Sequence, residues 1–379
     1  MRPTTLDPTK MGSKAQILEA NLRSRIVGQE EAVEPIANAY QTYLSGMTSA
    51  SRPIASFLFL GPTGSGKTRT VEAVADCLLN NPRAVIKIDC AEFQHSHEIS
   101  KLIGSPPGYI GHRETRPILS QSALDEHHTD TTKISIVLFD EIEKASDAVW
   151  NLLLGILDKA SLTLGDNRKV DFSRTMIFMT SNLGAAEMNA ELKPRLGFAP
   201  DRRVQDTEEI NGELGNRMHS LGLEAVRRRF TPEFVNRLDH IVVFKPLART
   251  ELRQILDIEL RMMQEQIFRT MLDRTFVFSV SEAAKEFLLD EGTNLNYGAR
   301  HLKRAIERFV VHPMSNLIAT EQIIDGDAIL IDHYRDAATM NFSIEGQNLE
   351  FPEMTAVTSL HAAQLPATSV VVAAKAGMR

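Results

Sequence analysis

Five short apolar runs recur along the first two thirds of the chain. They are apolar throughout rather than alternating, they are rich in β-branched and aromatic residues, and segments of helical character separate them. The runs are Ala55–Leu60, Ala84–Ile88, Ile134–Phe139, Thr175–Met179 and Ile241–Phe244. Strands of this kind are typical of parallel sheets that are covered on both faces. The pattern therefore predicts an α/β fold, with a parallel sheet flanked by helices.

The hydrophobic pattern changes after Pro246. Apolar residues recur there at helical spacing from Leu252 to Ile267, and a second helical stretch runs from about Arg300 to Pro313. The later segment GDAILIDHYRDAATMNFSI is typical of a closing pair of strands. These features predict a second, smaller domain that is mostly helical and contains a short strand pair.

These patterns predict four parts of the chain. Residues 21–245 form the large α/β domain, and residues 246–345 form the small helical domain. Residues 1–20 are polar without a strong period and predict an N-terminal arm. Residues 346–379 are poor in charge and predict a flexible tail.

Composition limits the classes of partner and location. The 379 residues include 42 Lys and Arg against 49 Asp and Glu, a net charge of −7, so no global positive field attracts nucleic acid. Only two cysteines are present, which fits a reducing compartment. The N-terminus lacks the apolar core of a secretory signal, and no apolar run reaches the length of about 18 residues that a membrane span requires. We expect a soluble, cytoplasmic protein that binds neither nucleic acid nor a membrane.

The segment after the first predicted strand carries the most specific motif. It reads GPTGSGKT and has the G-x-x-x-x-G-K-[ST] pattern of a phosphate-binding loop. Glycines let the backbone turn so that successive N–H groups point at phosphate oxygens, and the following helix directs its positive end at the same anion. Lys67 adds a cation for the β- and γ-phosphates, and Thr68 adds a hydroxyl for Mg²⁺. The predicted nucleotide-binding residues are Gly61, Pro62, Thr63, Gly64, Ser65, Gly66, Lys67 and Thr68.

The apolar run SIVLF ends in two carboxylates, Asp140 and Glu141. Ligands of open α/β sheets bind at the carboxyl ends of the strands, so we expect this pair beside the phosphate loop. Asp140 suits the Mg²⁺ shell together with Thr68, and Glu141 can orient or deprotonate the attacking water. An acidic pair that only caps the next helix is the alternative. With a phosphate loop in the same chain, the pair favours hydrolysis over binding alone.

Five segments in order along the chain resemble one known family: GPTGSGKT, FDEIEKA, MTSNLG, FTPEFVNRLD and NYGARHLKRAI. The chain is similar to the C-terminal ATPase module of the Clp/ClpB class of AAA+ ATPases, from Arg25–Val33 to the strand pair near Ile344. The resemblance implies a P-loop NTPase fold with a helical lid, ATP and Mg²⁺ as cofactors, and ATP hydrolysis. It also implies self-association into a ring, for which six subunits is the family's number. Only one phosphate loop is present, which predicts a single-module chain.

The resemblance assigns further site residues. Asn182 matches sensor 1, which holds the attacking water, and Arg237 matches the arginine finger, which enters the site of a neighbouring subunit. Arg300 matches sensor 2, which reaches the γ-phosphate from the small domain. Val27 belongs to the segment that cups the adenine. An isolated arginine usually lies on a solvated helix face, so these roles depend on the ordered set of motifs.

Two loops are expected to contact other polypeptides. The segment GSPPGYIGH resembles the family's axial pore loop, and it would present Tyr109 and Ile110 to a protein substrate in a central channel. Leu196, Gly197 and Phe198 resemble the tip with which Clp unfoldases dock on a ClpP-like peptidase. An ordinary turn is the alternative for either segment.

The chain also departs from the family pattern. Residues 112–116 lack the tyrosine and paired glycines that usually follow the pore loop, and Ala160-Ser161 stand where Gly-Arg is usual. Both changes lie outside the residues assigned to hydrolysis.

We therefore predict an ATPase that forms a ring and threads or remodels protein substrates through a central pore. One alternative is an ATP-driven remodeller of a single protein assembly that does not thread its substrate. A second is an ATP-switched scaffold with little turnover. A nucleic-acid motor is a further alternative, and the acidic charge balance disfavours it.

Overall fold

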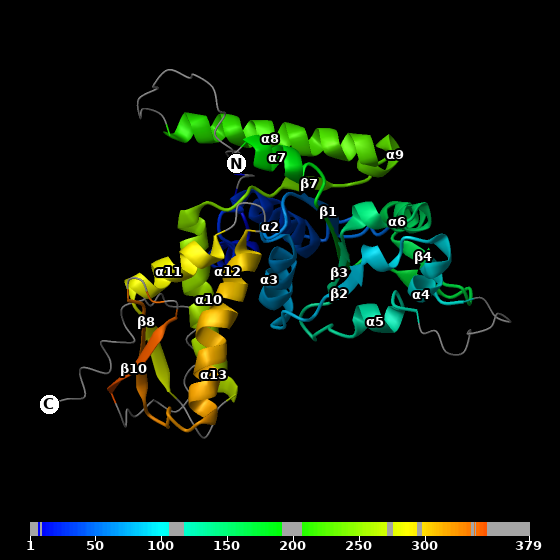
Figure 1. Ribbon diagram of the computed structural model, residues 1–379. Coiled ribbons are helices and arrows are strands. Elements are labelled where there is room, and N and C mark those ends of the chain that lie inside the picture. The colour runs from blue at the N-terminus through cyan, green and yellow to red at the C-terminus, as the bar shows by residue number, and fades with distance from the viewer. Residues whose placement is uncertain are drawn as a thin grey trace, which may run out of the picture. The chain divides into compact units, whose positions relative to one another are not determined.

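The computed structural model describes residues 7, 10–105, 117–191, 207–270, 276–293, 298–334, 337 and 339–346. The chain divides into two compact units, Met1–Glu251 with Asn294–Ala299, and Leu252–Thr293 with Arg300–Arg379. Each unit has its own sheet, coloured along the chain in Figure 1. No helix in the described part of the chain is long and apolar enough to cross a membrane.

The first unit is built on a parallel sheet of five strands in the order β2-β3-β6-β1-β7. All five predicted strands are present in it, which confirms the α/β prediction. The strands are β1 (Ala55–Leu60), β2 (Ile86–Asp89), β3 (Ser135–Asp140), β6 (Thr175–Ser181) and β7 (His240–Val243). The register pairs Leu60 with Ser181 and Asp89 with Asp140, so the carboxyl ends of the strands meet at one edge of the sheet.

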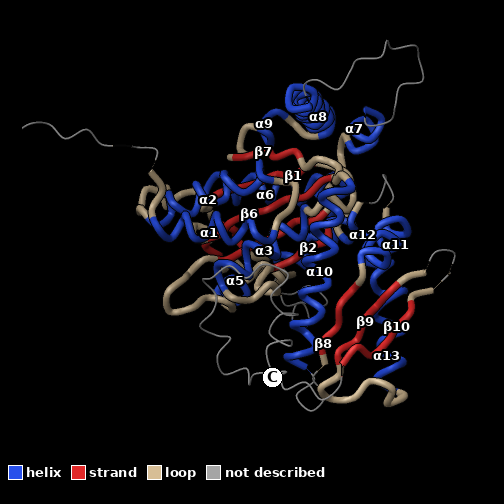
Figure 2. The backbone as a smooth tube through the Cα atoms, turned by 90° about the vertical axis from the view of Figure 1, so that its left-hand side faces the viewer, coloured by secondary structure: helices blue, strands red, loops and turns tan. Residues whose placement is uncertain are grey.

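Helices cover both faces of this sheet, as Figure 2 shows. Side chains alternate along β1: Phe57 and Phe59 belong to a core with the first three helices, and Leu58 and Leu60 belong to a core with later ones. The first three helices are α1 (Ser13–Arg25), α2 (Glu30–Leu44) and α3 (Lys67–Leu79). The later ones include α6 (Asp147–Lys159), α8 (Thr207–Arg229) and α9 (Pro232–Val235). This two-sided burial explains why the strands are apolar throughout.

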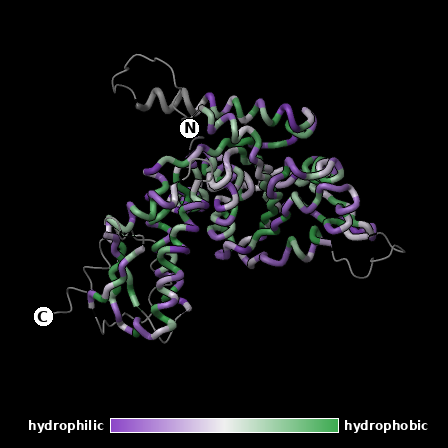
Figure 3. Tube along the Cα trace, in the orientation of Figure 1, coloured by the Kyte–Doolittle hydropathy of each residue, from purple (hydrophilic) through white to green (hydrophobic). Residues whose placement is uncertain are grey.

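Shorter elements complete the first unit. They are α4 (Ser100–Ile103), α5 (Gln121–Asp125), α7 (Ala185–Glu191), the hairpin strands β4 (Ser161–Thr163) and β5 (Lys169–Asp171), and 3₁₀ turns at Cys90–Glu92, Ser96–Ile99 and Ile142–Lys144. Figure 3 shows hydrophilic and hydrophobic residues alternating along the described part of α8, which fits a helix that packs on one side.

The first helix corrects the sequence analysis. Residues 13–20 were predicted to lie in an arm, but they belong to α1, where Ala15, Leu18 and Leu22 are buried. These three positions are three and four residues apart and therefore share one helix face. Polar residues elsewhere on the helix hide this short stripe in a sequence pattern.

The second unit is mostly helical, as predicted. It contains α10 (Arg249–Thr270), α11 (Glu282–Gly292), α12 (Ala299–Ile306), a π-helical turn (Glu307–Val311) and α13 (His312–Ala319). The predicted strand pair is present as β9 (Ala328–Asp332) and β10 (Asn341–Gly346), which pair antiparallel. A third strand that was not predicted, β8 (Val277–Val280), pairs parallel to β9. The predicted tail beyond residue 346 lies outside the described residues.

Candidate functional site

The predicted phosphate loop joins the carboxyl end of β1 to the first turn of α3. Gly61 has φ +143°, and a Cβ there would lie 2.4 Å from the carbonyl oxygen of Phe244, so only glycine fits. Gly66 precedes α3 with φ +100°, in the left-handed region. The strand–loop–helix arrangement on which phosphate binding depends is therefore present. The remaining predicted loop residues, Pro62, Thr63, Gly64, Ser65 and Thr68, follow in this same connection.

Lys67 is buried at the start of α3 and is surrounded by oxygen acceptors. Its side chain is only 7% exposed, and Nζ donates to the carbonyl oxygens of Gly61 at 2.7 Å and Pro62 at 2.9 Å. A third acceptor is Oδ1 of Asn182 at 3.0 Å. None of these three acceptors carries a formal charge. These three hydrogen bonds fix the ammonium beside the turn between β1 and α3.

Asp140 and Glu141 lie at the carboxyl end of β3, as predicted. The Asp140 carboxylate accepts a hydrogen bond from Thr180 and forms an ion pair with Lys87 at 2.9 Å. Glu141 adopts a left-handed backbone conformation, with φ +54° and ψ +50°, which turns the chain directly after the strand. Its N–H donates to the Thr180 hydroxyl at 3.1 Å. Strain of this kind at a non-glycine residue is common at functional sites.

The Glu141 carboxylate also pairs with Lys144, at 2.5 Å. The hydrogen bond that Lys144 donates to Glu141 raises the pKa of Lys144 above its ordinary value, and the opposite charge of Glu141 adds to this effect. Lys144 is therefore cationic at neutral pH and places a positive charge beside the Glu141 carboxylate.

Asn182 connects the two halves of the site. It follows β6, which lies between β1 and β3 in the sheet. Its Oδ1 accepts from Lys67, and its Nδ2 donates to Oε1 of Glu141 at 3.3 Å. One amide thus touches the predicted phosphate-binding cation and the predicted base, because an amide offers an acceptor and a donor on one rigid plane.

Glu143 is a site residue that the sequence analysis missed. Its Oε1 accepts a hydrogen bond from the backbone N–H of Asn182 at 3.0 Å, so Glu143 fixes the backbone that carries the Asn182 side-chain amide. The other carboxylate oxygen, Oε2, is buried and has no hydrogen-bond partner in the described structure. The sequence offered one signal, a third carboxylate two residues after Glu141.

Gln29 is a second missed residue. It is 5% exposed, and its side chain donates to the carbonyl oxygens of Ser65 at 3.1 Å and Lys245 at 2.8 Å. Its Oε1 accepts from the N–H of Lys245 at 3.0 Å. Gln29 therefore fastens the phosphate loop to the chain after β7. Val27, predicted at the adenine, is partly buried two residues earlier.

The donor set at this edge of the sheet fits Mg²⁺. The metal prefers hard oxygen ligands, usually one or two from the protein and the rest from phosphate and water. The Thr68 hydroxyl in the first turn of α3 and the Asp140 carboxylate at the end of β3 are of that kind. In the described residues, no cluster of three or more His, Cys, Asp or Glu side chains forms a metal site without a nucleotide.

The two predicted arginines are not part of this cluster. Arg237 forms ion pairs with Asp158 of α6, at 2.7 Å, and with Glu233 of α9, at 3.0 Å. Arg300 is exposed at the second position of α12 and belongs to the second unit. The residue before it, Ala299, belongs to the first unit, and its N–H donates to the carbonyl oxygen of Gly64 at 3.1 Å.

Two further predictions cannot be placed. Tyr109 and Ile110 of the predicted pore loop, and Leu196, Gly197 and Phe198 of the predicted peptidase tip, lie outside the described residues.

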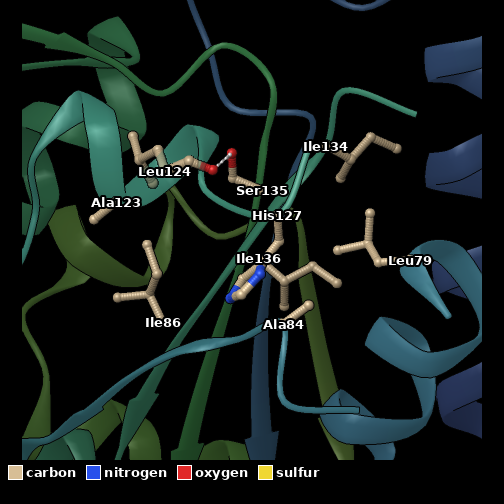
Figure 4. A pocket seen from close by; sticks show the side chains of 9 residues that line it. All are labelled: Leu79, Ala84, Ile86, Ala123, Leu124, His127, Ile134, Ser135 and Ile136. Atoms are coloured by element: carbon tan, nitrogen blue, oxygen red, sulfur yellow. Dashed lines mark hydrogen bonds between the residues drawn. The ribbon is translucent and has the colours of Figure 1, made fainter. Parts of the chain in front are cut away.

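A small pocket in Figure 4 is a separate feature. It lies at the beginning of β3, the end opposite to Asp140, and its lining is mainly apolar. The Ser135 hydroxyl there donates to the carbonyl oxygen of Leu124 at 2.9 Å. Its lining contains no lysine, no arginine and no glycine-rich loop, so it differs from the predicted phosphate site.

Comparisons with known proteins agree with this geometry. Residues 52–241 match the family described as AAA domain (Cdc48 subfamily), and residues 247–331 match the C-terminal, D2-small domain of ClpB protein. The chain is 39% identical over 315 residues to the chloroplastic chaperone protein ClpC1 of Arabidopsis thaliana, covering 83% of this chain and 32% of that protein. It is 38% identical over 316 residues to the ATP-binding subunit ClpC of the Clp protease of Staphylococcus saprophyticus, covering 83% and 36%.

Solved structures show the same fold. A Saccharomyces cerevisiae Hsp104:casein complex in an extended conformation superposes with a TM-score of 0.72 at 30% identity, covering 88% of this chain and 53% of that one. A closed state of Hsp104 with ATPγS and FITC-casein gives a TM-score of 0.70 at 31% identity, covering 87% and 52%. The chain thus spans about a third of the curated relatives and about half of these solved chains.

Proposed function

The chain belongs to the AAA domain family and carries the D2-small domain of ClpB, and from this membership we propose that it is the ATPase of a protein unfoldase or chaperone. Family members of this kind are ATPases. The coupling of hydrolysis to protein unfolding is the finer step. Curated relatives named as Clp chaperones and solved Hsp104 complexes with casein support it.

One observation carries the hydrolytic assignment. The Asn182 amide contacts Lys67 and Glu141 at the same time, at 3.0 and 3.3 Å. Lys67 would bind the β- and γ-phosphates, and Asn182 and Glu141 would hold a water for in-line attack. Mg²⁺, held by Thr68 and Asp140 together with the nucleotide, would offset negative charge on the phosphates. Residues 21–245 would form the nucleotide-binding domain and residues 246–345 the lid, from which Arg300 would reach the γ-phosphate.

Glu141→Gln tests this assignment. The amide has almost the shape of the carboxylate but cannot accept a proton, so we expect ATP binding within about threefold of wild type and turnover reduced about 10²- to 10⁴-fold. A binding titration and a steady-state ATPase assay measure the two quantities. An unchanged turnover rate would assign the chemistry to another group and would favour an ATP-switched scaffold.

We further propose that Arg237 acts in trans within a ring, probed by mixing variants. A ring built only from Arg237→Ala subunits should bind ATP and turn over slowly. In mixtures with Glu141→Gln subunits, an intact Arg237 meets an intact Glu141 at some interfaces, so activity should exceed that of either variant alone. Mixtures with no gain in activity would contradict action in trans. Electron microscopy with a slowly hydrolysed nucleotide would count the subunits.

Threading is the remaining proposal, and Tyr109 is its test. If Tyr109 and Ile110 grip substrate in a pore, Tyr109→Ala should abolish the unfolding of a model protein while ATP hydrolysis continues. A remodeller of one assembly would keep its activity in this variant. Docking on a ClpP-like peptidase through Leu196, Gly197 and Phe198 can be followed separately, because Phe198→Ala should then lose peptidase binding and keep unfolding.

A further inference from the structure

The single tryptophan of the chain lies beside the turn that carries Glu141. Trp150 is in the first half of α6, and its indole Nε1–H donates to the carbonyl oxygen of Ile142 at 3.1 Å. Ile142 begins the short 3₁₀ turn that directly follows Glu141. The indole therefore fastens α6 to the backbone next to the proposed base.

Arg229, the last residue of α8, holds the same turn from a second side. Its guanidinium donates two hydrogen bonds to the carbonyl oxygen of Glu143, from Nη2 at 2.7 Å and from Nε at 3.2 Å. Its Cζ also lies 4.4 Å from the centre of the Trp150 ring, in cation–π geometry. One planar group thus joins α6 and α8 to the turn formed by Glu141–Lys144, which we call the hydrolytic turn. We refer to Arg229, Trp150 and the carbonyl of Glu143 as the clamp.

The clamp continues into the segment that carries Arg237. Phe230, the residue after Arg229, packs edge-on against Trp150 with ring centres 5.3 Å apart. Phe230 in turn stacks on Phe234 of α9 at 5.2 Å. Arg237 follows α9 and returns to α6 through its ion pair with Asp158 at 2.7 Å.

Helix α6 therefore contacts the hydrolytic turn near one end and Arg237 near the other. It is anchored by a buried face made of Val149, Leu153, Ile156 and Leu157. A short helix packed in this way moves as a rigid rod rather than bending, because close-packed interiors transmit displacement. A shift of the turn at Ile142 would be carried along α6 to Asp158.

From these contacts we infer that Arg229 is a positioning residue that couples the hydrolytic turn of one subunit to the arginine finger it offers to the next. The inference rests on the proposed function, since it needs Glu141 to be the base and Arg237 to act in trans. Arg229 touches neither nucleotide nor water in this role. It acts through the backbone of the turn and through Trp150.

The contacts require an arginine in particular. A guanidinium can donate two hydrogen bonds to one carbonyl while lying flat on an aromatic face, whereas a lysine ammonium is a point charge with no plane to stack. Arg229→Met removes the guanidinium, and with it both contacts, and keeps an unbranched side chain. Arg229 is exposed, so this change removes no buried packing. Arg228→Met is the matched control, because that exposed neighbour pairs only with Glu224 of its own helix among the described contacts.

The kinetic test compares kcat with KM. We expect Arg229→Met to lower kcat for ATP about tenfold and to leave KM within about twofold, because the phosphate loop is untouched. Arg229→Lys should recover part of the loss, and Arg228→Met should match wild type. If the wild-type protein hydrolyses ATP and Arg229→Met does so at the same kcat, the coupling role is wrong while the proposed function stands. A wild-type protein without ATPase activity would overturn both.

Tryptophan fluorescence supplies a readout that a purely structural role would not move. Because Trp150 is the only tryptophan, its emission reports on the clamp alone. We expect ATPγS to change the emission of wild type and of Arg228→Met in a saturable way, and to leave the emission of Arg229→Met unchanged although the nucleotide binds. An equal change in Arg229→Met would show that Trp150 senses nucleotide without Arg229, and this would overturn the inference.

Discussion

Two cations of the first unit, Lys67 and Arg237, are each proposed to meet a phosphate, and the chain holds them in opposite ways. Lys67 is 7% exposed and donates to two backbone carbonyls and one side-chain amide, all of them uncharged. Arg237 has a side chain that is 26% exposed and pairs with two carboxylates, Asp158 and Glu233.

The two side chains therefore differ in the kind of partner that these contacts provide. Two backbone carbonyls of the loop and the Asn182 amide fix the position of the Lys67 ammonium. Two carboxylates offset the charge of Arg237, so this side chain can bind a phosphate only if it releases at least one of them. A cation that binds phosphate in its own subunit can be fixed beside the site when the chain folds. A cation that binds phosphate in a neighbouring subunit needs other partners until that subunit is present.

The largest effect should come from removing the cation of the predicted phosphate loop, Lys67. Lys67→Ala should weaken ATP binding by more than about 100-fold, because the loss leaves the carbonyls of Gly61 and Pro62 facing the phosphates without a counter-charge. Isothermal titration calorimetry measures this. Lys169→Ala, at an exposed lysine of β5, is the control and should bind normally. Binding within about threefold of wild type in Lys67→Ala would place the phosphate site elsewhere.

The second prediction asks whether charge alone suffices at Arg237. Arg237→Lys keeps a cation but loses the planar fork that can bridge carboxylates or phosphate oxygens. We expect kcat to fall about 10²- to 10³-fold with ATP affinity retained, measured by steady-state ATPase and binding assays. Arg253→Lys is a matched control, since Arg253 also pairs with two carboxylates, Glu282 and Glu286, in the second unit. A full-rate Arg237→Lys enzyme would contradict the finger role.

The third prediction concerns the support of the phosphate loop. Gln29→Ala leaves the carbonyls of Ser65 and Lys245 and the N–H of Lys245 without their partner. We expect the free energy of unfolding to fall by about 1–3 kcal/mol and ATP affinity to fall about tenfold. Urea denaturation and calorimetry measure these quantities. The control is Gln41→Ala, which removes one exposed hydrogen bond to Gly12 and should change little.

The smallest predicted effect depends on pH. Burial lowers the pKa of His240 below its ordinary value, and the neighbouring Asp239 opposes this only in part. His240 therefore binds a proton more readily in the unfolded chain than in the folded one. The free energy of unfolding keeps its full value above pH about 6.5 and declines as the pH falls below that value. His240→Phe keeps a ring stacked on Phe57. The fall in melting temperature between pH 7 and pH 5.5 should therefore be about 1–3 °C smaller in this variant than in wild type.

The control for the pH prediction is His219→Phe, which changes an exposed residue of α8 and should keep the wild-type slope. Some slope should remain in His240→Phe, because burial also lowers the pKa of His128. An identical pH dependence in wild type and His240→Phe would show that the burial of His240 has no energetic consequence.

Motifs whose residues are close in the sequence were predicted well. The run Ala55–Leu60 coincides with β1, the phosphate loop and the start of α3 at Lys67 follow as expected, and Asp140 ends β3. Each rests on a local rule: an apolar run for a strand covered on both faces, and glycines where the backbone must turn. β2 begins two residues later than predicted, because the first two residues of the apolar run lie before Ile86, where the pairing with β3 begins.

Contacts between distant residues were not predictable in this way. Gln29 reaches Lys245 across 216 positions, and Glu143 reaches the N–H of Asn182 across 39. A buried polar residue looks like an exposed one in sequence, and only its partners reveal the difference. Similarly, β8 lacks a distinctive pattern, since all four of its residues are only partly buried.

The sequence by itself therefore determined the fold class, the phosphate loop, the carboxylates that end β3 and the order of the two units, because each follows from residue type at short spacing. Only the tertiary structure decided that the Asn182 amide joins Lys67 to Glu141, that Arg237 rests on two carboxylates, and that Arg229 and Trp150 hold the turn after β3. The strand order β2-β3-β6-β1-β7 brings these residues together. That order arises from packing between segments far apart in the chain, which no local pattern encodes.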